Sequence, residues 1–268
     1  MSDFCNIAPR TNTISFPNHS VIWGTHVFSL SLPSADLPRE LTDLLNMKKI
    51  RKKSNDDIDM NTERLDLNNV STDELAYILS ILRKIKQLYL LSSDIDFSRF
   101  SFPPMLRTLI INNSNILNLK GFSNKENLDY LSLTGCNAND FSSIADFVNL
   151  ETLILNNTAV KRFPPLQRLT KLQRVEANHT QIEDLTSLPK LSSLKVLMLK
   201  NASLKRLNGI KNLPALEHLD ISNTSVSSIS ALEHLRNLKY INLINTAVSA
   251  AEIAEFRKQH PQAIVVSP

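Results

Sequence analysis

Leucine recurs every 22 residues along most of this chain, and that period constrains the fold more than any other feature of the sequence. Further apolar residues stand three, five and ten positions after each leucine, and the second half of most units is apolar at every third residue. A unit this short cannot bury a core by itself, so its copies must stack on one another. The leucines that set the period are Leu106, Leu128, Leu150, Leu172, Leu194, Leu216 and Leu238.

Each unit predicts one short β-strand and a return segment that is not an α-helix. In the unit that begins at Leu150, Leu153 and Leu155 flank Ile154, which places the two leucines inward and the isoleucine outward. The three-residue period of the return segment matches a 3₁₀ or extended turn better than an α-helix. The sequence therefore predicts an α/β solenoid, a curved array with short parallel β-strands on the concave side, 3₁₀ or extended turns on the convex side, and a cap at each end.

The strand half of the unit can be written L-x-x-L-x-L-x-x-T-x-[VIL], as in LETLILNNTAV from Leu150. It resembles the leucine-rich repeat family in its 22-residue form, similar to phosphatase-regulator and bacterial internalin-like arrays, over roughly residues 62–250. That family usually has Asn at the ninth position, where this chain has Thr158 and other small residues. The resemblance implies a protein-interaction module that binds a protein partner.

The ninth position of each unit predicts a buried ladder of small side chains. In the family's usual form the Asn there bonds backbone groups that the tight turn leaves unpaired. Ser, Thr or Cys can meet part of that need, whereas Ala202 cannot. Asparagine instead recurs one step earlier, as at Asn157. The ladder residues are Ser93, Ser114, Cys136, Thr158, Thr180, Thr224 and Thr246.

The N-terminal part of the chain predicts a tail and a cap. Residues 1–15 read as a disordered tail, and residues 16–60 read as a hairpin that turns near Gly24 followed by a helix that begins near Asp36. The cap would cover the core layer that the first repeat leaves exposed.

The array itself is predicted over residues 61–248, in about eight or nine units. The first unit carries a return segment with helical spacing, which Ser71 or Thr72 would N-cap. Residues 249–268 predict a C-terminal cap, in which a helix with Ser249 as its N-cap precedes a last strand.

The third, fifth and seventh positions of each unit are predicted to line the concave face. Several of them are apolar or aromatic, and contiguous apolar patches mark interaction sites, while Tyr is enriched in binding hot spots. The alternative is that such residues merely suit a strand. The candidate partner-binding residues are Tyr89, Leu91, Ile110, Tyr130, Ile154, Arg174, Glu176, Met198, His218 and Tyr240.

Charge offers a second reading of function. The net charge is +4, and the one dense basic run is Lys48–Lys53. That run would suit nucleic acid or an anionic surface, although such runs are more often the solvated end of a helix. We expect a protein partner and no small-molecule substrate, and nucleic acid remains the alternative.

No motif in the sequence indicates catalysis. The chain has neither a glycine-rich phosphate loop nor an H-E-x-x-H or C-x-x-C pairing, so we expect no enzyme, metal or cofactor. His218 and Asp220 are both expected on the concave surface and would form half of a metal or acid/base site, but no third ligand accompanies them. Solvated surface is the better interpretation of this pair.

The expected location is the cytoplasm. The two cysteines, Cys5 and Cys136, stand far apart and suggest reduced thiols. Neither a secretory signal nor a transmembrane stretch is evident in the sequence. A narrower hypothesis is a bacterial effector delivered into a host cell, suggested by the bacterial-type repeat and by Val265 and Val266, an apolar pair near the C-terminus as in some type IV secretion signals.

Overall fold

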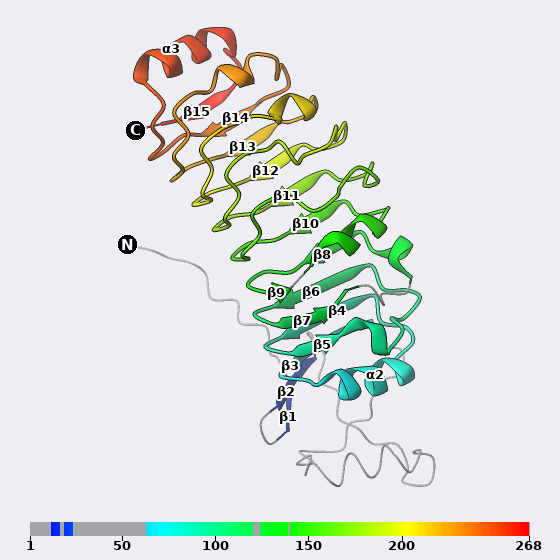
Figure 1. The fold of residues 1–268 in the computed structure, drawn as a ribbon. Helices are drawn as coiled ribbons and strands as arrows, with labels where there is room; N and C mark the ends of the chain where they lie inside the picture. The colour runs from blue at the N-terminus through cyan, green and yellow to red at the C-terminus, as the bar shows by residue number, and fades with distance from the viewer. Residues whose placement is uncertain (1–11, 17–18, 24–62, 120–123, 139, 268) are drawn as a thin grey trace, which may run out of the picture.

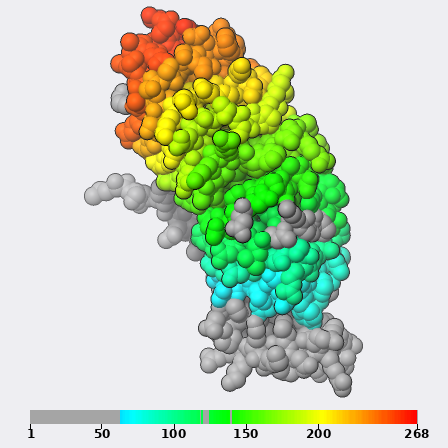
Figure 2. Space-filling view, viewed as in Figure 1, coloured from blue at the N-terminus to red at the C-terminus, as the bar shows by residue number. Residues whose placement is uncertain are grey.

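The computed structural model describes residues 12–16, 19–23, 63–119, 124–138 and 140–267. Its strands form a 12-stranded sheet in the order β1-β2-β3-β4-β6-β8-β10-β11-β12-β13-β14-β15 and a 3-stranded sheet in the order β5-β7-β9. Figure 1 shows the strands of the large sheet stacked one above another, and Figure 2 shows an elongated body that bends along its length. The predicted α/β solenoid is confirmed.

The large sheet is parallel from β3 to β15, and its register follows the repeat. Leu131, Leu153 and Val175 stand opposite one another on three successive strands, each a repeat apart. The strands of the array are β3 (Arg64–Asn68), β4 (Gln87–Leu91), β6 (Thr108–Asn112), β8 (Tyr130–Ser132), β10 (Thr152–Ile154), β11 (Arg174–Glu176), β12 (Val196–Met198), β13 (His218–Asp220) and β14 (Tyr240–Asn242).

The repeating leucines form one continuous core. Leu150, Leu153 and Leu155 have no exposed side-chain surface, and the equivalent residues of the other units are buried with them. Each fully buried Leu contributes about 1.5–3 kcal/mol relative to an exposed one. The return segments that close each layer are short 3₁₀ turns or extended chain, namely η1 (Phe97–Arg99), η2 (Lys125–Asn127), η3 (Ser142–Asp146), η4 (Ile210–Asn212) and η5 (Ser230–Leu232).

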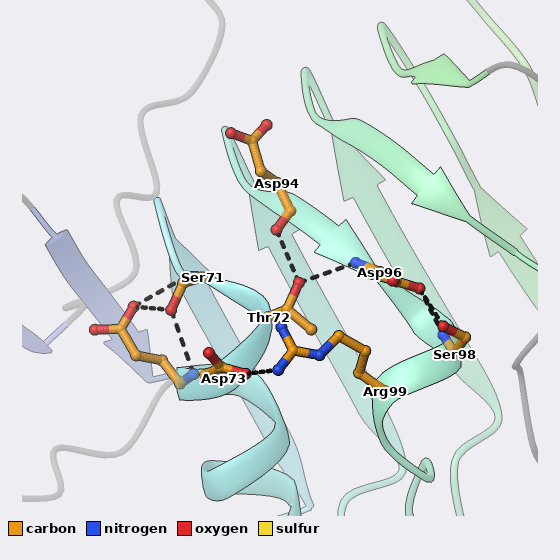
Figure 3. Close-up of polar contacts among 8 residues, drawn as sticks. Ser71, Thr72, Asp73, Asp94, Asp96, Ser98 and Arg99 are labelled. Carbon is orange, nitrogen blue, oxygen red and sulfur yellow. Dashed lines mark hydrogen bonds and ion pairs between the residues drawn. The ribbon is translucent and has the colours of Figure 1, made fainter.

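The first unit closes with an α-helix instead, and its N-terminus is tied to the second unit. Helix α2 (Thr72–Ile81) has Ser71 as its N-cap, with a capping box completed by Glu74. The Thr72 hydroxyl donates to the backbone oxygen of Asp94 at 3.2 Å and accepts from the backbone N–H of Asp96 at 3.0 Å (Figure 3). These bonds join α2 to β5 (Asp94–Asp96), which begins the smaller sheet with β7 (Asn115–Asn118) and β9 (Asn137–Ala138).

The asparagines of the eighth position have a conformational cause. Residues at this position adopt left-handed backbone angles as the chain leaves each strand, with a φ of 56° at Asn157. Asn and Gly tolerate this region better than other residues because their steric penalty there is smaller. The residues with positive φ along this line are Asn69, Ser92, Asn113, Gly135, Asn157, His179, Asn201, Asn223 and Asn245.

The ninth-position side chains are buried, except that Thr246 is half-buried, and they bond in two ways. In the N-terminal units they link neighbours, because the Ser93 hydroxyl accepts from the backbone N–H of Val70 and the Ser114 hydroxyl accepts from that of Ser93. From Thr158 onward each threonine hydroxyl closes its own turn, as Thr158 does by donating to the backbone oxygen of Leu155 at 2.7 Å. Ala202 has no hydroxyl, and in its layer the backbone N–H of Ala202 donates to the oxygen of Leu199.

The first two strands of the structure precede the predicted turn near Gly24. Strand β1 (Asn12–Phe16) pairs antiparallel with β2 (His19–Trp23), which in turn pairs with β3. Strand β1 corrects the prediction of a disordered tail over residues 1–15 for the residues from Asn12 onward. The predicted turn near Gly24 lies outside the described residues. The missed signal is the dipeptide Pro17-Asn18, two turn-forming residue types between alternating segments. The helix predicted near Asp36 lies outside the described residues.

The C-terminal end of the array is covered by a helix and a strand. Helix α3 (Ala250–Gln259) has Ser249 as its N-cap, and it buries Ile253 and Phe256 against the last repeat. Strand β15 (Ile264–Val266) then adds to the large sheet beside β14. No helix in the described part of the chain combines the length and apolar character needed to cross a membrane.

Candidate functional site

The strands of the array place the third, fifth and seventh positions on the concave face in rows. Because the register advances by one repeat per strand, residues of one position stand beside each other, as Tyr89 beside Ile110 and Ser132 beside Ile154 do. Most members of these rows are half-buried, since each side chain is partly covered by its neighbours on the adjacent strands. The rows therefore form a continuous lining rather than isolated side chains.

The N-terminal part of this face is apolar. Tyr89 and Ile110 are half-buried, and Leu91 is 38% exposed. Together with Tyr130 and Ile154, which follow two and three strands further on, they form a set that we call the apolar cluster. A hollow opens beside its first members, and its lining includes Asp66, Asn68, Tyr89, Leu91, Ile110 and Asn112.

The first strand supplies a charged border to this hollow. Arg64 forms an ion pair with Asp66, with 3.1 Å between Arg64 Nε and Asp66 Oδ1, and its guanidinium carbon lies 4.1 Å from the centre of the Tyr89 ring. Stacking of this kind holds both the cation and the aromatic ring in place. Tyr89 is therefore presented in a fixed orientation at the edge of the hollow.

Ser132 interrupts the apolar cluster at its middle. It stands between Ile110 and Ile154 in the fifth-position row, and only 4% of its surface is exposed. Tyr130, in the same strand, is half-buried. Burial raises the pKa of the Tyr130 phenol, and the carboxylate of Glu176 raises it further. Tyr130 therefore stays neutral at physiological pH. It lies on β8, between the strands of Ile110 and Ile154.

The centre of the concave face is polar and internally bonded. Arg174 Nε donates to Glu176 Oε1 at 2.7 Å, and the amide of Asn156 donates to Glu176 Oε2 at 2.9 Å. The Asn156 side-chain oxygen accepts from the backbone N–H of Asn178, and that of Asn178 accepts from Lys200 in the same way. Arg174 and Glu176 therefore satisfy each other, and they mark the limit of the apolar cluster.

The C-terminal part of the face carries the remaining predicted residues. Met198 is half-buried, and the rings of His218 and Tyr240 stack with 6.1 Å between their centres. Tyr240 stands opposite Ile264 of β15, which is 64% exposed. This part is separated from the apolar cluster by the polar centre, so the ten predicted residues do not form one patch.

The sequence predicts that Asp220 faces solvent on the concave surface, but the structure buries its side chain. It is 7% exposed, and its carboxylate accepts from the backbone N–H of Ser222 at 2.9 Å and from the side chain of Asn242 at 3.2 Å. These bonds draw the side chain onto the sheet, so Asp220 supports β13 and β14 and does not form a site with His218. Within the described ranges no cluster of three or more His, Cys, Asp or Glu residues suits a metal ion.

The second position of the units forms ion pairs along the rim of the face. Lys239 Nζ lies 2.5 Å from Glu217 Oε2, and Lys195 Nζ lies 3.8 Å from Glu217 Oε1. The hydrogen bond from Lys239 lowers the pKa of Glu217, and the charge of Lys195 adds to this. Lys86 with Glu63, and Arg107 with Asp129, form similar pairs in the first units. The charges of this rim thus largely compensate one another.

The sequence analysis did not identify the residues that the first strand contributes to the site. Arg64, Asp66 and Asn68 occupy the third, fifth and seventh positions of the first unit, so extending the same columns one unit towards the N-terminus would have found them. The basic run Lys48–Lys53 lies outside the described residues, and its role in binding nucleic acid or an anionic surface stays a prediction.

Comparisons with known proteins agree on the repeat. A family model described as Leucine Rich repeats (2 copies) matches residues 148–190. A search of curated proteins found no match. Among solved structures the chain is similar to internalin C2 from Listeria monocytogenes, with 23% sequence identity, a TM-score of 0.56, and coverage of 81% of this chain and 88% of that chain.

Two further solved structures match this chain over about half of their own length. A leucine-rich repeat protein of Leptospira interrogans shows 22% identity and a TM-score of 0.52, with 69% of this chain and 55% of that chain covered. The functional domain of InlJ from Listeria monocytogenes shows 14% identity and a TM-score of 0.50, with 77% and 53% covered. The chain thus spans about half the length of these two proteins, and at such identities the likeness shows the fold alone.

Proposed function

We infer that this chain, a leucine-rich repeat protein, is an interaction module that binds a protein partner on its concave face. The single observation that carries the proposal is the apolar cluster of Tyr89, Leu91, Ile110, Tyr130 and Ile154 beside the hollow at the N-terminal end of the face. Interfaces commonly centre on aromatic and aliphatic side chains that enter a pocket on the partner or form one themselves.

The packing around the apolar cluster favours binding over a purely structural role. A strand residue that serves only the fold need not be held in one orientation on the solvent side. Tyr89, however, lies under the guanidinium of Arg64, which is itself fixed by Asp66. A ring held in this way loses little conformational freedom on binding, which reduces the entropic cost of association.

The polar centre supports a definite footprint for the partner. Arg174 and Glu176 are already paired, and Asn156 and Asn178 already donate or accept hydrogen bonds within the sheet. Covering them offers a partner little new bonding and would require their desolvation. The proposed footprint therefore runs over β3, β4, β6, β8 and β10 and ends before Arg174.

A narrower version of the proposal is a bacterial effector that engages a host protein, acting in the host cytoplasm. Its support is the bacterial-type repeat and the similarity in fold to structures from Listeria and Leptospira. Val265 and Val266 lend it no weight, because both lie in β15 and pair with the sheet. A protein that works in the cytoplasm of its own cell would use the same face.

The test is the combined substitution of Tyr89, Ile110 and Ile154 by Asp, with affinity capture from cell lysate and mass spectrometry to identify the partner. We expect affinity for the purified partner to fall by about 100-fold or more, since three central apolar contacts become buried charges. The matched control replaces Leu117 and Met105, which are 62% and 47% exposed outside the concave strands, by Asp. Equal binding by both variants, with unchanged circular dichroism, would reject the concave face.

A further inference from the structure

The C-terminal part of the concave face carries more positive charge than its own carboxylates neutralise. The sequence from Leu185 to Leu216 contains six Lys and Arg residues and no Asp or Glu. Two of these cations, Lys195 and Lys200, belong to the unit of β12 and lie at opposite margins of the concave face. This layer of the sheet therefore presents positive charge on both sides of its strand.

The first margin is the rim on which Glu217 lies between two lysines. Lys239 Nζ lies 2.5 Å from Glu217 Oε2, and Lys195 Nζ lies 3.8 Å from Glu217 Oε1. The side chains of Lys195 and Lys239 are 54% and 64% exposed. One carboxylate cannot neutralise two ammonium groups, so this margin keeps a positive charge within reach of a bound partner.

The second margin is formed by Lys200, at the seventh position of its unit. Its backbone is held in place, because its N–H donates to the side-chain oxygen of Asn178 at 2.8 Å. Its side chain is exposed and forms no ion pair with the described residues, and its neighbours in the row, Asn178 and Ser222, are uncharged. The nearby carboxylates of Glu176 and Asp220 are already hydrogen-bonded within the sheet. The charge of Lys200 is therefore uncompensated.

The floor between the two margins is aliphatic and aromatic. Val196 stands opposite His218, and His218 stands opposite Tyr240. Val196, Met198 and Tyr240 are half-buried. Single-stranded nucleic acid binds by stacking its bases on open aromatic faces, but the rings of His218 and Tyr240 stack on each other here. The floor therefore suits the side chains of a polypeptide better than bases.

We propose that this part of the concave face binds an extended acidic segment of a protein partner. One carboxylate of the segment pairs with Lys195 and Lys239, and another pairs with Lys200. At the rise of a β-strand the backbones of residues 195 and 200 lie about 16 Å apart, which an extended segment of about five residues spans. Apolar side chains between the two carboxylates then lie over Val196 and Met198. This surface adds to the apolar cluster of the proposed function and uses none of its residues.

The experiment measures, by fluorescence anisotropy, the binding of a labelled peptide in which Glu alternates with Val and Leu to the full chain at low salt. We expect saturable binding, and binding at least about tenfold weaker when Gln replaces every Glu of the peptide. The double variant Lys195→Gln and Lys200→Gln should bind the acidic peptide about tenfold more weakly, because each margin loses a cation. Circular dichroism verifies its fold. Failure of wild type to bind, or equal binding of the two peptides, would overturn the proposal.

A matched control separates this site from the net charge of the unit. Lys205→Gln with Lys211→Gln removes the same charge from the same unit, but Lys205 pairs with Glu183 and Lys211 lies in η4, away from the concave strands. This control should bind the acidic peptide within about twofold of wild type. An equal loss in both double variants would overturn the proposal, and so would tighter binding of labelled oligouridine than of the acidic peptide. The apolar cluster is intact in all these variants, so capture of a partner through it tests the proposed function separately.

Discussion

The hydroxyl of Thr158 donates a 2.7 Å hydrogen bond to the backbone oxygen of Leu155, three residues earlier in the same turn. The same bond joins Thr180 to Ala177, Thr224 to Ile221 and Thr246 to Leu243. The turn that leaves each of these strands is therefore closed by a side chain, at the position where the family usually has Asn.

Replacing Thr158 by Val should destabilise the protein while preserving its fold. Valine keeps the shape of the side chain but leaves the buried oxygen of Leu155 without this donor, which costs about 1–3 kcal/mol. Chemical denaturation measures the loss, and Thr158→Ser is the control because it keeps the hydroxyl. Equal stability of the valine variant and wild type would mean that the turn does not depend on this bond.

A second prediction concerns Asn157, the residue with left-handed backbone angles that precedes Thr158. Asn157 has a φ of 56°, so Asn157→Ala should lower the free energy of unfolding by about 1–2 kcal/mol through the steric penalty of a β-carbon in this region. Asn157→Gly should be much closer to wild type, since glycine has no β-carbon. The two variants are compared by denaturation, and the prediction fails if glycine is the more damaging substitution.

Cys136 should be unreactive in the folded protein. Burial raises the pKa of its thiol to about 11, from an ordinary value of 9.0. The reactive thiolate is therefore scarce at pH 8. In a Cys5→Ser variant, a thiol reagent should label Cys136 slowly under native conditions and rapidly in denaturant. Rapid native labelling would contradict the burial of this layer.

The same shift fixes how Cys136 couples stability to pH. Because the folded pKa lies above the unfolded one, the neutral thiol favours the folded state. Its contribution is fully present below pH 9 and is lost as the pH rises towards 11. Comparing Cys136→Ser with its parent at pH 7 and pH 10 by denaturation should show the smaller difference at pH 10. An unchanged difference would show that this thiol does not titrate with unfolding.

His260 should be replaceable by an apolar residue with a gain in stability. It is 6% exposed, its ring stacks on Phe256 with 4.2 Å between ring centres, and neither ring nitrogen has a hydrogen-bond partner among the described residues. His260→Phe keeps an aromatic ring and removes the two unpaired polar atoms, so we expect the free energy of unfolding, measured with denaturant, to rise by about 1 kcal/mol. Phe256→Ala is the opposing control and should destabilise the C-terminal cap.

Much of the fold could be predicted because one apolar period determines both strand position and register. A one-residue shift would turn Leu153 and Leu155 outward and Ile154 inward, so only one register buries the core. The helix signals were equally local, since Ser71 and Glu74 form their capping box within four residues. Predictions of this kind depend on the spacing of residues along the chain, which the sequence displays directly.

The remaining features depend on which side chains form hydrogen bonds or ion pairs with one another in space. Asp220 occupies a concave position in the pattern, yet its carboxylate turns onto the sheet because Ser222 and Asn242 offer hydrogen bonds there. The serine hydroxyls of the ninth position bond both their own strand and the adjacent unit, whereas the threonine hydroxyls bond their own turn, a difference that no spacing reveals. The division of the concave face at Arg174 and Glu176 likewise follows from which side chains pair in space.

The constant 22-residue register bears on how such a chain changes over generations. From β8 to β14 each strand pairs with the next at the same offset, Tyr130 with Thr152 and Thr152 with Arg174. Removal or duplication of one whole unit by recombination would leave every surviving strand facing a neighbour of matching register. The concave face can therefore lengthen or shorten in steps of one strand spacing, about 4.8 Å, while the two ends keep their caps.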